Sequence, residues 1–286
     1  MKKTLHVALI GSVALPASAA IIAEDNFLVG SDPSAGQYVA GSAVVPASPT
    51  TTGYTGAWQD APFNDVSHTV GATSLSYSDP NYLGSSGGSL TSVNSARNGR
   101  NLATTYDDSF AGTVYLSFLM QVDAPSTAGS YRAFEGWDGA GLADGPNRNF
   151  QLGVHTPGGN TGDFGDVTQF GFRLNNSNTT RATLGAFDSN VNLWVVRFDF
   201  SNTAGGDSAT VWKNPVIDGT EPAGGTTVSG ADLQIGSLGL ARFSSADLAL
   251  DEIRLGDTFS DVTGVPEPSS VLLSFLGALA LIRRRR

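Results

Sequence analysis

The chain of 286 residues contains 26 acidic residues against 16 Lys and Arg, no cysteine, and 40% hydrophobic residues. This hydrophobic content can offset the entropy lost on folding, so the composition excludes a disordered chain. The lack of cysteine excludes a disulfide framework, thiol catalysis and cysteine-ligated zinc or iron–sulfur sites.

The body of the chain is strongly acidic once its two ends are set aside. Residues 20–265 hold 25 acidic and 10 basic residues, a net charge of −15, and Lys213 is their only lysine. Nucleic acids are bound through clustered Lys and Arg side chains that neutralise phosphates. We therefore expect no nucleic-acid partner.

The first 19 residues have the order of a secretory signal peptide. Two lysines precede an apolar stretch at residues 7–15, and small residues follow it. This stretch is too short to be a permanent anchor, so the order predicts a signal helix that signal peptidase removes after Ala19 or Ala20.

Residues 20–264 show the period-two alternation of half-buried strands and almost no helical periodicity. Strands are predicted at residues 113–122, 150–154, 170–174, 192–201, 208–213 and 248–255. The side chains predicted to face the core include Val114, Leu116, Phe118, Met120, Val122, Phe150, Leu152, Val154, Phe170, Phe172, Leu174, Trp194, Val196, Phe198, Phe200 and Ile253. About ten to twelve such strands without intervening helices favour an all-β fold, an antiparallel β-sandwich or barrel.

We expect a single domain over residues 20–264. The Ser/Thr/Pro/Gly-rich stretch at residues 42–56 resembles a linker in composition, but only about 20 residues of the body precede it. Because so short a segment is too small for a domain, a long surface loop is the better interpretation.

A second targeting segment is predicted at residues 265–286, where Pro266, Glu267 and Pro268 precede an uncharged stretch at 269–282. Fourteen helical residues reach about 21 Å, short of a hydrocarbon core of about 30 Å, so we expect a short transmembrane helix with snorkelling arginines. The arginines are Arg283, Arg284, Arg285 and Arg286. Clustered arginines remain cytoplasmic, which predicts that the body lies outside the inner membrane.

The order of Pro-Glu-Pro, apolar helix and arginine run resembles the PEP-CTERM sorting signal of Gram-negative bacteria. The resemblance implies that a membrane transpeptidase, exosortase, recognises Pro266-Glu267-Pro268 and removes the helix and the arginines. It also implies that the released protein reaches the cell surface or the extracellular polysaccharide matrix. The activity of the body remains open.

Three segments of the body resemble exported proteins with a concanavalin A-like, laminin G-like jelly roll. These segments are residues 24–27, residues 211–215 and residues 250–256. The resemblance implies that the first and last strands pair in one sheet, which would bring Phe27 near Ile253. The alternative is an immunoglobulin-like sandwich, which would need two domains at this length, and no boundary between them is visible.

Catalytic motifs are scarce. The three histidines are His6, His68 and His155, of which only two lie in the body, and the chain has no HExxH, which disfavours a hydrolytic triad or a zinc site. Jelly-roll glycoside hydrolases resembling this body place Glu, Asp and Glu at alternate positions of one strand, and no E-x-D-x-E occurs here. Asp251 and Glu252 are adjacent on a predicted strand, so they should point to opposite faces and cannot share one substrate.

A glycan site is predicted on the face that Glu135 and Trp137 share. Carbohydrates bind to aromatic platforms beside amide and carboxylate groups, and Arg148 and Gln151 lie on the next predicted strand. If this face binds a glycan, we expect Trp137 to be an exposed platform; the alternative is that Trp137 is a buried core residue. The other tryptophans, Trp58, Trp194 and Trp212, are predicted to pack in the core or under loops.

The loops at residues 138–147 and 163–166 are rich in the oxygen ligands that calcium prefers. One hypothesis is a structural Ca²⁺ held by Asp138, Asp144, Asp163 and Asp166. The other is that these loops are acidic turns without a metal.

The sequence thus predicts a non-enzymatic exported protein of the cell surface or extracellular matrix, whose β-sandwich has a structural or glycan-binding role. The alternative is a polysaccharide-acting glycoside hydrolase on the same fold. The absence of a strand with paired acids favours the first interpretation.

Overall fold

The computed structural model describes residues 20–61, 66–82, 85–93, 95–123, 131–139, 148–155, 169–177, 179–243 and 247–264, with the backbone alone at His155. The predicted signal helix at 1–19 and the predicted transmembrane helix at 269–282 lie outside the described residues. Within the described part of the chain, no helix has the length and apolar character needed to cross a bilayer.

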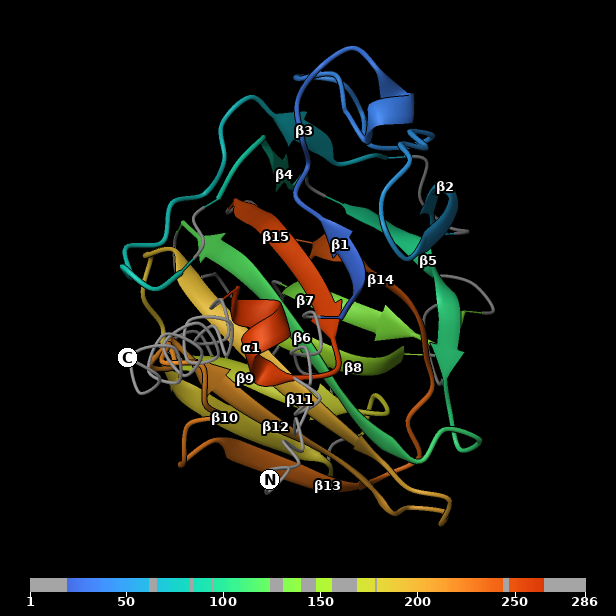
Figure 1. Ribbon diagram of the computed structural model, residues 1–286, viewed down its shortest axis with the longest axis vertical. Helices are drawn as coiled ribbons and strands as arrows, with labels where there is room; N and C mark the ends of the chain where they lie inside the picture. Colours follow the sequence, from blue (N-terminus) through green and yellow to red (C-terminus); the bar gives the residue numbers. More distant parts are fainter. Residues whose placement is uncertain are drawn as a thin grey trace, which may run out of the picture.

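Two antiparallel sheets face each other and form a β-sandwich of the jelly-roll kind (Figure 1). The eight-stranded sheet contains β1 (Ile21–Asp25), β3 (Thr69–Gly71), β4 (Ser89–Thr91), β6 (Gly112–Val122), β11 (Asn192–Phe200), β12 (Asp207–Lys213), β13 (Thr226–Ala231) and β15 (Leu248–Gly256). The seven-stranded sheet contains β2 (Tyr54–Asp60), β5 (Ala96–Tyr106), β7 (Tyr131–Trp137), β8 (Arg148–His155), β9 (Gln169–Leu174), β10 (Arg181–Ala186) and β14 (Ile235–Phe243). The prediction of an all-β antiparallel sandwich is confirmed.

Strand order follows β13-β12-β11-β6-β15-β4-β3 in the larger sheet and β10-β9-β8-β7-β14-β5-β2 in the smaller one. The first strand, β1, pairs with the last strand, β15, with Asp25 opposite Ile253. This pairing of chain ends, expected from the jelly-roll resemblance, is therefore present. The described residues also include two short helical segments, η1 (Pro33–Ala35) and α1 (Phe259–Thr263).

The core lies between the sheets and consists of the inward side chains predicted from the alternation. Aromatic rings cross the gap between the layers: Phe118 of β6 lies 4.4 Å from Phe134 of β7, measured between ring centroids, and Phe198 of β11 lies 5.1 Å from Phe150 of β8. All sixteen side chains listed above for the core are buried. The alternation therefore predicted the inner faces of the principal strands correctly, because the side-chain period of a strand is two residues.

The outer face of the eight-stranded sheet is also covered. Helix α1 packs there through Phe259 and Val262, in a hydrophobic cluster that includes Trp212. Thr258 caps the helix, since its hydroxyl accepts from the backbone N–H of Asp261 and the Asp261 carboxylate accepts from the backbone N–H of Thr258. The Ser117 hydroxyl of β6 donates to the Val262 carbonyl at 2.5 Å, which holds the helix on the sheet.

Two adjacent buried acids of β15 fix the loop that precedes β4. A register irregularity follows Asp251, and Glu252 has a positive φ of 52°. The Asp251 carboxylate accepts from the backbone N–H of Leu75 at 2.9 Å and from the Ser74 hydroxyl at 2.5 Å, and Glu252 accepts from the backbone N–H of Ser86 at 2.8 Å. Both carboxylates therefore accept hydrogen bonds from the same loop. The expectation that they point to opposite faces is wrong, because the irregularity in β15 places both Leu250 and Ile253 in the core.

We predict that Phe198→Ala lowers the free energy of unfolding by about 3–5 kcal/mol, the usual effect of emptying an aromatic core site. Phe198 is 1% exposed and lies between the two sheets. Denaturant unfolding of the purified protein measures the change. Val216→Ala is the matched control, because that side chain is 69% exposed and its truncation should change stability by less than about 0.5 kcal/mol.

Stability should also depend on pH through Asp251. Burial raises the pKa of Asp251 from 3.8 to about 8, and the neighbouring charge of Glu252 adds to the rise. The folded state therefore holds this proton more tightly than the unfolded chain does, so the contribution is complete below about pH 4 and is lost as the pH rises to about 8. We expect Asp251→Asn, which imitates the neutral side chain, to reduce the fall in unfolding free energy between pH 5 and pH 8. Parallel curves for the two proteins would contradict the assignment.

Candidate functional site

The outer face of the seven-stranded sheet brings together the side chains predicted to bind a glycan. On β7, Tyr131, Ala133, Glu135 and Trp137 alternate with Phe134, which faces the core. Glu135 lies opposite Gln151 of β8, and Gln151 lies opposite Arg173 of β9. Strand register therefore arranges carboxylate, amide and guanidinium groups in one row across three strands.

Glu135 is the centre of a buried polar network on this face. The side chain is fully buried, with Oε2 3.0 Å from Nε of Arg97 and Oε1 3.1 Å from Nη1 of Arg148. The Tyr131 hydroxyl donates to the same carboxylate, and the Gln151 amide donates to the Tyr131 oxygen at 2.8 Å. A buried carboxylate needs such partners, because desolvation of an unpaired charge is costly.

The two guanidinium groups decide the protonation state of Glu135. Burial acts to raise the pKa of Glu135, but the charges of Arg97 and Arg148 outweigh it and hold the pKa below its usual value. The group is thus an ionised acceptor over the neutral pH range. A general acid for glycosidic cleavage needs the opposite, a carboxyl group with a raised pKa.

Trp137 differs from the prediction. The side chain is on the expected face but is fully buried, and it packs with Ala61. The expectation of an exposed platform is wrong, because the alternation along β7 specifies which face a residue occupies and does not specify whether that face is covered. Glu135, Arg148 and Gln151 are brought together as predicted, and glycan binding by them remains a prediction.

Three members of the network were not predicted from the sequence, namely Arg97, Tyr131 and Arg173. Arg173 donates through Nε to Gln151 Oε1 at 2.5 Å and through a terminal nitrogen to Asn176 at 2.6 Å. Its position between Phe172 and Leu174 on an alternating strand could have placed it on the outer face. Arg97 could not have been predicted from the alternation. It lies on β5 and Glu135 lies on β7, and the strand between them, β14, comes much later in the sequence.

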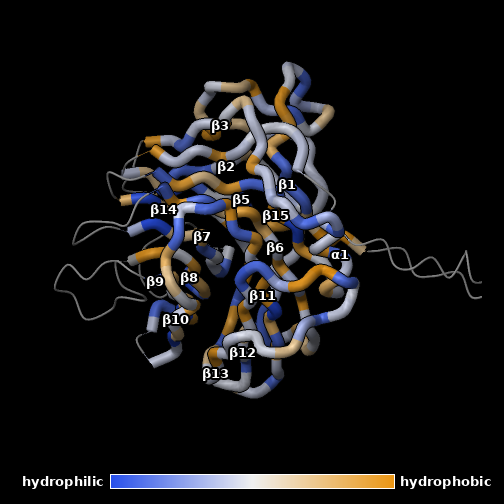
Figure 2. The backbone as a smooth tube through the Cα atoms, turned by 90° about the vertical axis from the view of Figure 1, so that its left-hand side faces the viewer, coloured by the Kyte–Doolittle hydropathy of each residue, from blue (hydrophilic) through white to orange (hydrophobic). Residues whose placement is uncertain are grey.

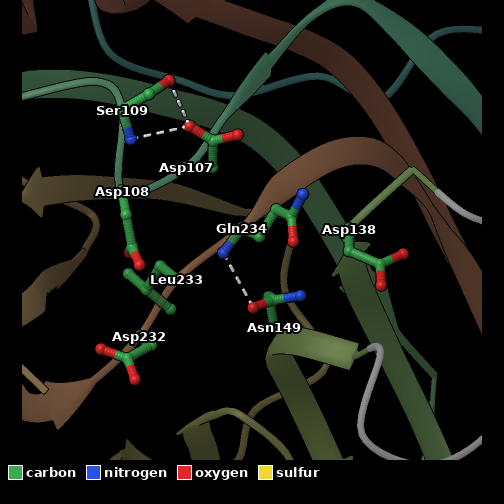
Figure 3. A pocket seen from close by; sticks show the side chains of 8 residues that line it. All are labelled: Asp107, Asp108, Ser109, Asp138, Asn149, Asp232, Leu233 and Gln234. Atoms are coloured by element: carbon green, nitrogen blue, oxygen red, sulfur yellow. Dashed lines mark hydrogen bonds between the residues drawn. The ribbon is translucent and has the colours of Figure 1, made fainter. Parts of the chain in front are cut away.

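An open acidic pocket of about 450 Å³ lies where β5 and β7 end and where β8 and β14 begin (Figure 3). It is lined by Asp107, Asp108, Ser109, Asp138, Asn149, Asp232, Leu233 and Gln234. In the view of Figure 3, the amide groups of Asn149 and Gln234 lie between Asp138 and Asp232. The pocket therefore combines carboxylate, amide and hydroxyl groups, and more of its surface is polar than apolar.

Local hydrogen bonds fix several of these lining groups. The backbone N–H of Gln234 donates to Asn149 Oδ1 at 2.8 Å, which joins the start of β14 to the start of β8. The Ser109 hydroxyl donates to Asp107 Oδ1 at 2.6 Å, and this bond, with one from the Ser109 backbone, lowers the pKa of Asp107. Asp232 accepts from the backbone N–H of Gly205. These residues are thereby presented as fixed hydrogen-bond acceptors.

Metal binding was predicted at four aspartates, of which only Asp138 is among the described residues, and it lines the pocket. Asp144, Asp163 and Asp166 lie outside the described residues. In the part of the chain that the structure describes, no three His or acidic side chains are grouped closely enough to hold a metal ion. The calcium hypothesis therefore stays a prediction for the remaining loops.

The imidazole of His68 has a structural role, because it is hydrogen-bonded to the backbone in the interior of the protein. It is fully buried, with Nε2 3.0 Å from the Leu240 carbonyl oxygen, and Nδ1 accepts from the backbone N–H of Val93 at 3.0 Å. Burial lowers the pKa of His68 to about 4, so the ring is neutral near pH 7. Both ring nitrogens are occupied by backbone groups, which leaves neither for a nucleophile or a metal.

Comparison with family models identifies one segment. The PEP-CTERM protein-sorting motif matches residues 264–286, and this motif implies export, sorting to the cell surface and processing by exosortase. The sorting resemblance found in Pro266-Glu267-Pro268 and the terminal arginines is confirmed. A comparison with curated protein sequences found no match.

Among solved structures, the chain is similar to a botulinum neurotoxin serotype D binding domain, at 9% identity and a TM-score of 0.43 over 76% of this chain and 47% of that one. It is also similar to the T. cruzi calreticulin globular domain, at 12% identity and a TM-score of 0.43 over 80% and 95% of the two chains. A third is a glycosyl hydrolase family 16 protein from Mycobacterium smegmatis, at 15% identity and a TM-score of 0.41 over 82% and 100%. The chain spans about half the length of the neurotoxin domain.

The burial of Trp137 yields a stability prediction. We expect Trp137→Ala to lower the free energy of unfolding by about 3–5 kcal/mol, as for other buried aromatic residues. Urea unfolding checks this, with Val39→Ala as the control, since Val39 is 56% exposed. A loss below about 1 kcal/mol would restore the interpretation of Trp137 as an exposed platform.

Proposed function

We propose that this protein is an exported, non-catalytic component of the cell surface or extracellular matrix that binds polysaccharide. Its binding site is the acidic pocket at the end of the seven-stranded sheet. The observation that carries the proposal is the chemistry of that pocket, and the sorting motif at residues 264–286 supports the destination.

The pocket suits a ligand rich in hydroxyl groups. Its volume of about 450 Å³ lies within the range of small-ligand sites. The Asn149 and Gln234 amides can donate and accept, and the aspartates accept hydrogen bonds from sugar hydroxyls. A hydrogen bond to a charged group is stronger than one between neutral groups, so the carboxylates contribute most of the expected affinity.

Charge restricts the class of polysaccharide. Four aspartates line the pocket, and the body as a whole carries a net charge of −15. Acidic polysaccharides would be repelled by both, whereas neutral chains or chains with amino sugars would not. The proposed ligand is therefore a neutral or amino-sugar polysaccharide.

The groups present support binding without turnover. Glu135 is the one carboxylate at the outward positions of β7 and β8 among the described residues, and two arginines keep it ionised. Asp107 in the pocket has a lowered pKa as well. Glycoside hydrolysis needs a second carboxyl group that can donate a proton, and neither Glu135 nor Asp107 has the raised pKa that this role requires.

The experiment measures binding of the purified protein to a neutral β-glucan, to partly deacetylated chitin and to alginate by titration calorimetry. We expect binding to one of the first two and none to alginate. Asp108→Asn and Asp232→Asn should each weaken the affinity about tenfold, since each replaces a charged acceptor by a neutral one. Asp218→Asn is the matched control, because it removes the same charge from an exposed turn outside the pocket.

Two results would contradict the proposal. Equal losses of affinity in the pocket variants and in Asp218→Asn would mean that net charge, and not the pocket, governs binding. Release of reducing ends that disappears in Glu135→Gln would establish the glycoside hydrolase alternative. We expect no release with any of the three polysaccharides.

A further inference from the structure

The two ends of the folded body lie on one side of the sandwich. The register of β1 on β15 pairs Ile21 with Gly256, so the chain enters the body beside the strand from which it leaves. After Gly256 the chain continues directly into α1, on the outer face of the eight-stranded sheet. Figures 1 and 2 both place α1 beside β15 and β1, and Figure 2 places α1 on the opposite side of the molecule from β8, β9 and β14.

Both ends are fixed to the body. Val262 is fully buried, and the backbone N–H of Gly264 donates to the Ser260 carbonyl at 3.0 Å, which closes the helix at the last described residue. At the other end, the backbone N–H of Glu24 donates to the Thr52 carbonyl at 3.0 Å in addition to the pairing of β1 with β15. Neither end can move away from the sandwich without breaking buried contacts.

The tethers to the two predicted membrane segments are short. Four residues separate Gly264 from Ser269, where the uncharged stretch begins, and four separate Leu15 from Ala20, so each tether spans five residue-to-residue steps. A fully extended chain spans at most about 3.6 Å per residue, so neither tether can exceed about 18 Å in any conformation. If a bilayer holds either segment, the end of the folded body on the α1 side therefore lies within about 18 Å of the start of that segment.

We propose that the outer face of the eight-stranded sheet around α1 is the surface that lies against the membrane until the tail is removed. The partner is the lipid headgroup layer, and the seven-stranded sheet faces away from it. The proposal uses the export part of the proposed function and is independent of polysaccharide binding. It also requires exosortase to reach Pro266, two residues after Gly264, within about 7 Å of the folded surface.

The chemistry of this face indicates that the tethers, and not charge, set the orientation. Asp218 and Asp257 are exposed on its loops, and anionic lipids would repel them. Val216 is the more exposed of the two large hydrophobic side chains that stand out in the described part of the chain, and the next residue, Ile217, packs in the same cluster as Phe259. A zwitterionic surface is therefore the suitable probe.

The absence of cysteine allows a direct test, because a single introduced cysteine can be labelled without competition. Ser260→Cys places a fluorophore on α1, and Thr183→Cys places one at an exposed position of β10 in the seven-stranded sheet. The full chain is incorporated into phosphatidylcholine vesicles that contain a lipid with a quencher on its headgroup. We expect quenching of the label at position 260 to exceed that at position 183 several-fold.

A second arm tests the tether itself. In the chain without residues 1–19, insertion of ten Gly and Ser residues between Gly264 and Val265 should reduce quenching at position 260 toward the value at position 183. The same insertion between Thr203 and Ala204, in the exposed turn between β11 and β12, should leave it unchanged. Equal quenching at the two labels, failure of the full chain to join vesicles, or no effect of the tail insertion would each overturn the proposal. The calorimetric result with polysaccharides is independent of all three outcomes.

Discussion

Burial of the central strands on both faces is the constraint on which this structure depends. Every residue of β7 is buried, and so are eight of the nine residues of β15 and of β14. A strand in such a position cannot direct its polar side chains to water, so each must find a partner within the protein. The Glu135 network on one sheet and the Asp251–Ser74 contact on the other both satisfy this requirement.

Glu135 and Asp251 have different kinds of partner for their buried carboxylates, and their pKa values shift in opposite directions. Glu135 has two guanidinium partners, and its pKa is lowered. Asp251 has hydroxyl and backbone donors but no cation among its hydrogen-bond partners, and its pKa is raised to about 8. Burial acts to raise both pKa values. At Glu135 the charges of the two arginines outweigh burial, whereas at Asp251 the hydrogen bonds from Ser74 and Leu75 do not.

The inner faces of the sandwich could be predicted from the sequence because they depend on local alternation. Val114 to Val122 and Trp194 to Phe200 each occupy the predicted face, and the pairing of β1 with β15 followed from the jelly-roll resemblance. The covering of the outer faces could not be predicted, since it depends on loops that return from distant parts of the chain. Trp137 was placed on the correct face but not recognised as buried, and Arg97 reaches Glu135 only because β14 lies between their strands.

The acidic pocket could not be predicted from the sequence either, because its residues come from distant parts of the chain. Asp107, Asp138 and Asp232 belong to three turns separated by many residues, and only the strand order β7-β14-β5 brings those turns together. Of the residues that line the pocket, only Asp138 was named from the sequence, where it was predicted to bind calcium together with Asp144, Asp163 and Asp166.

The strand order also separates the two surfaces that the proposals use. The pocket is built on the ends of β5, β7, β8 and β14, all in the seven-stranded sheet, whereas α1 and the chain exit belong to the eight-stranded sheet. The aromatic core between the layers keeps them on different sides of the sandwich, since Phe118 and Phe198 bridge the sheets. A body attached to the membrane through α1 would therefore leave its pocket accessible, so removal of the tail would change the location of the protein without changing its binding site.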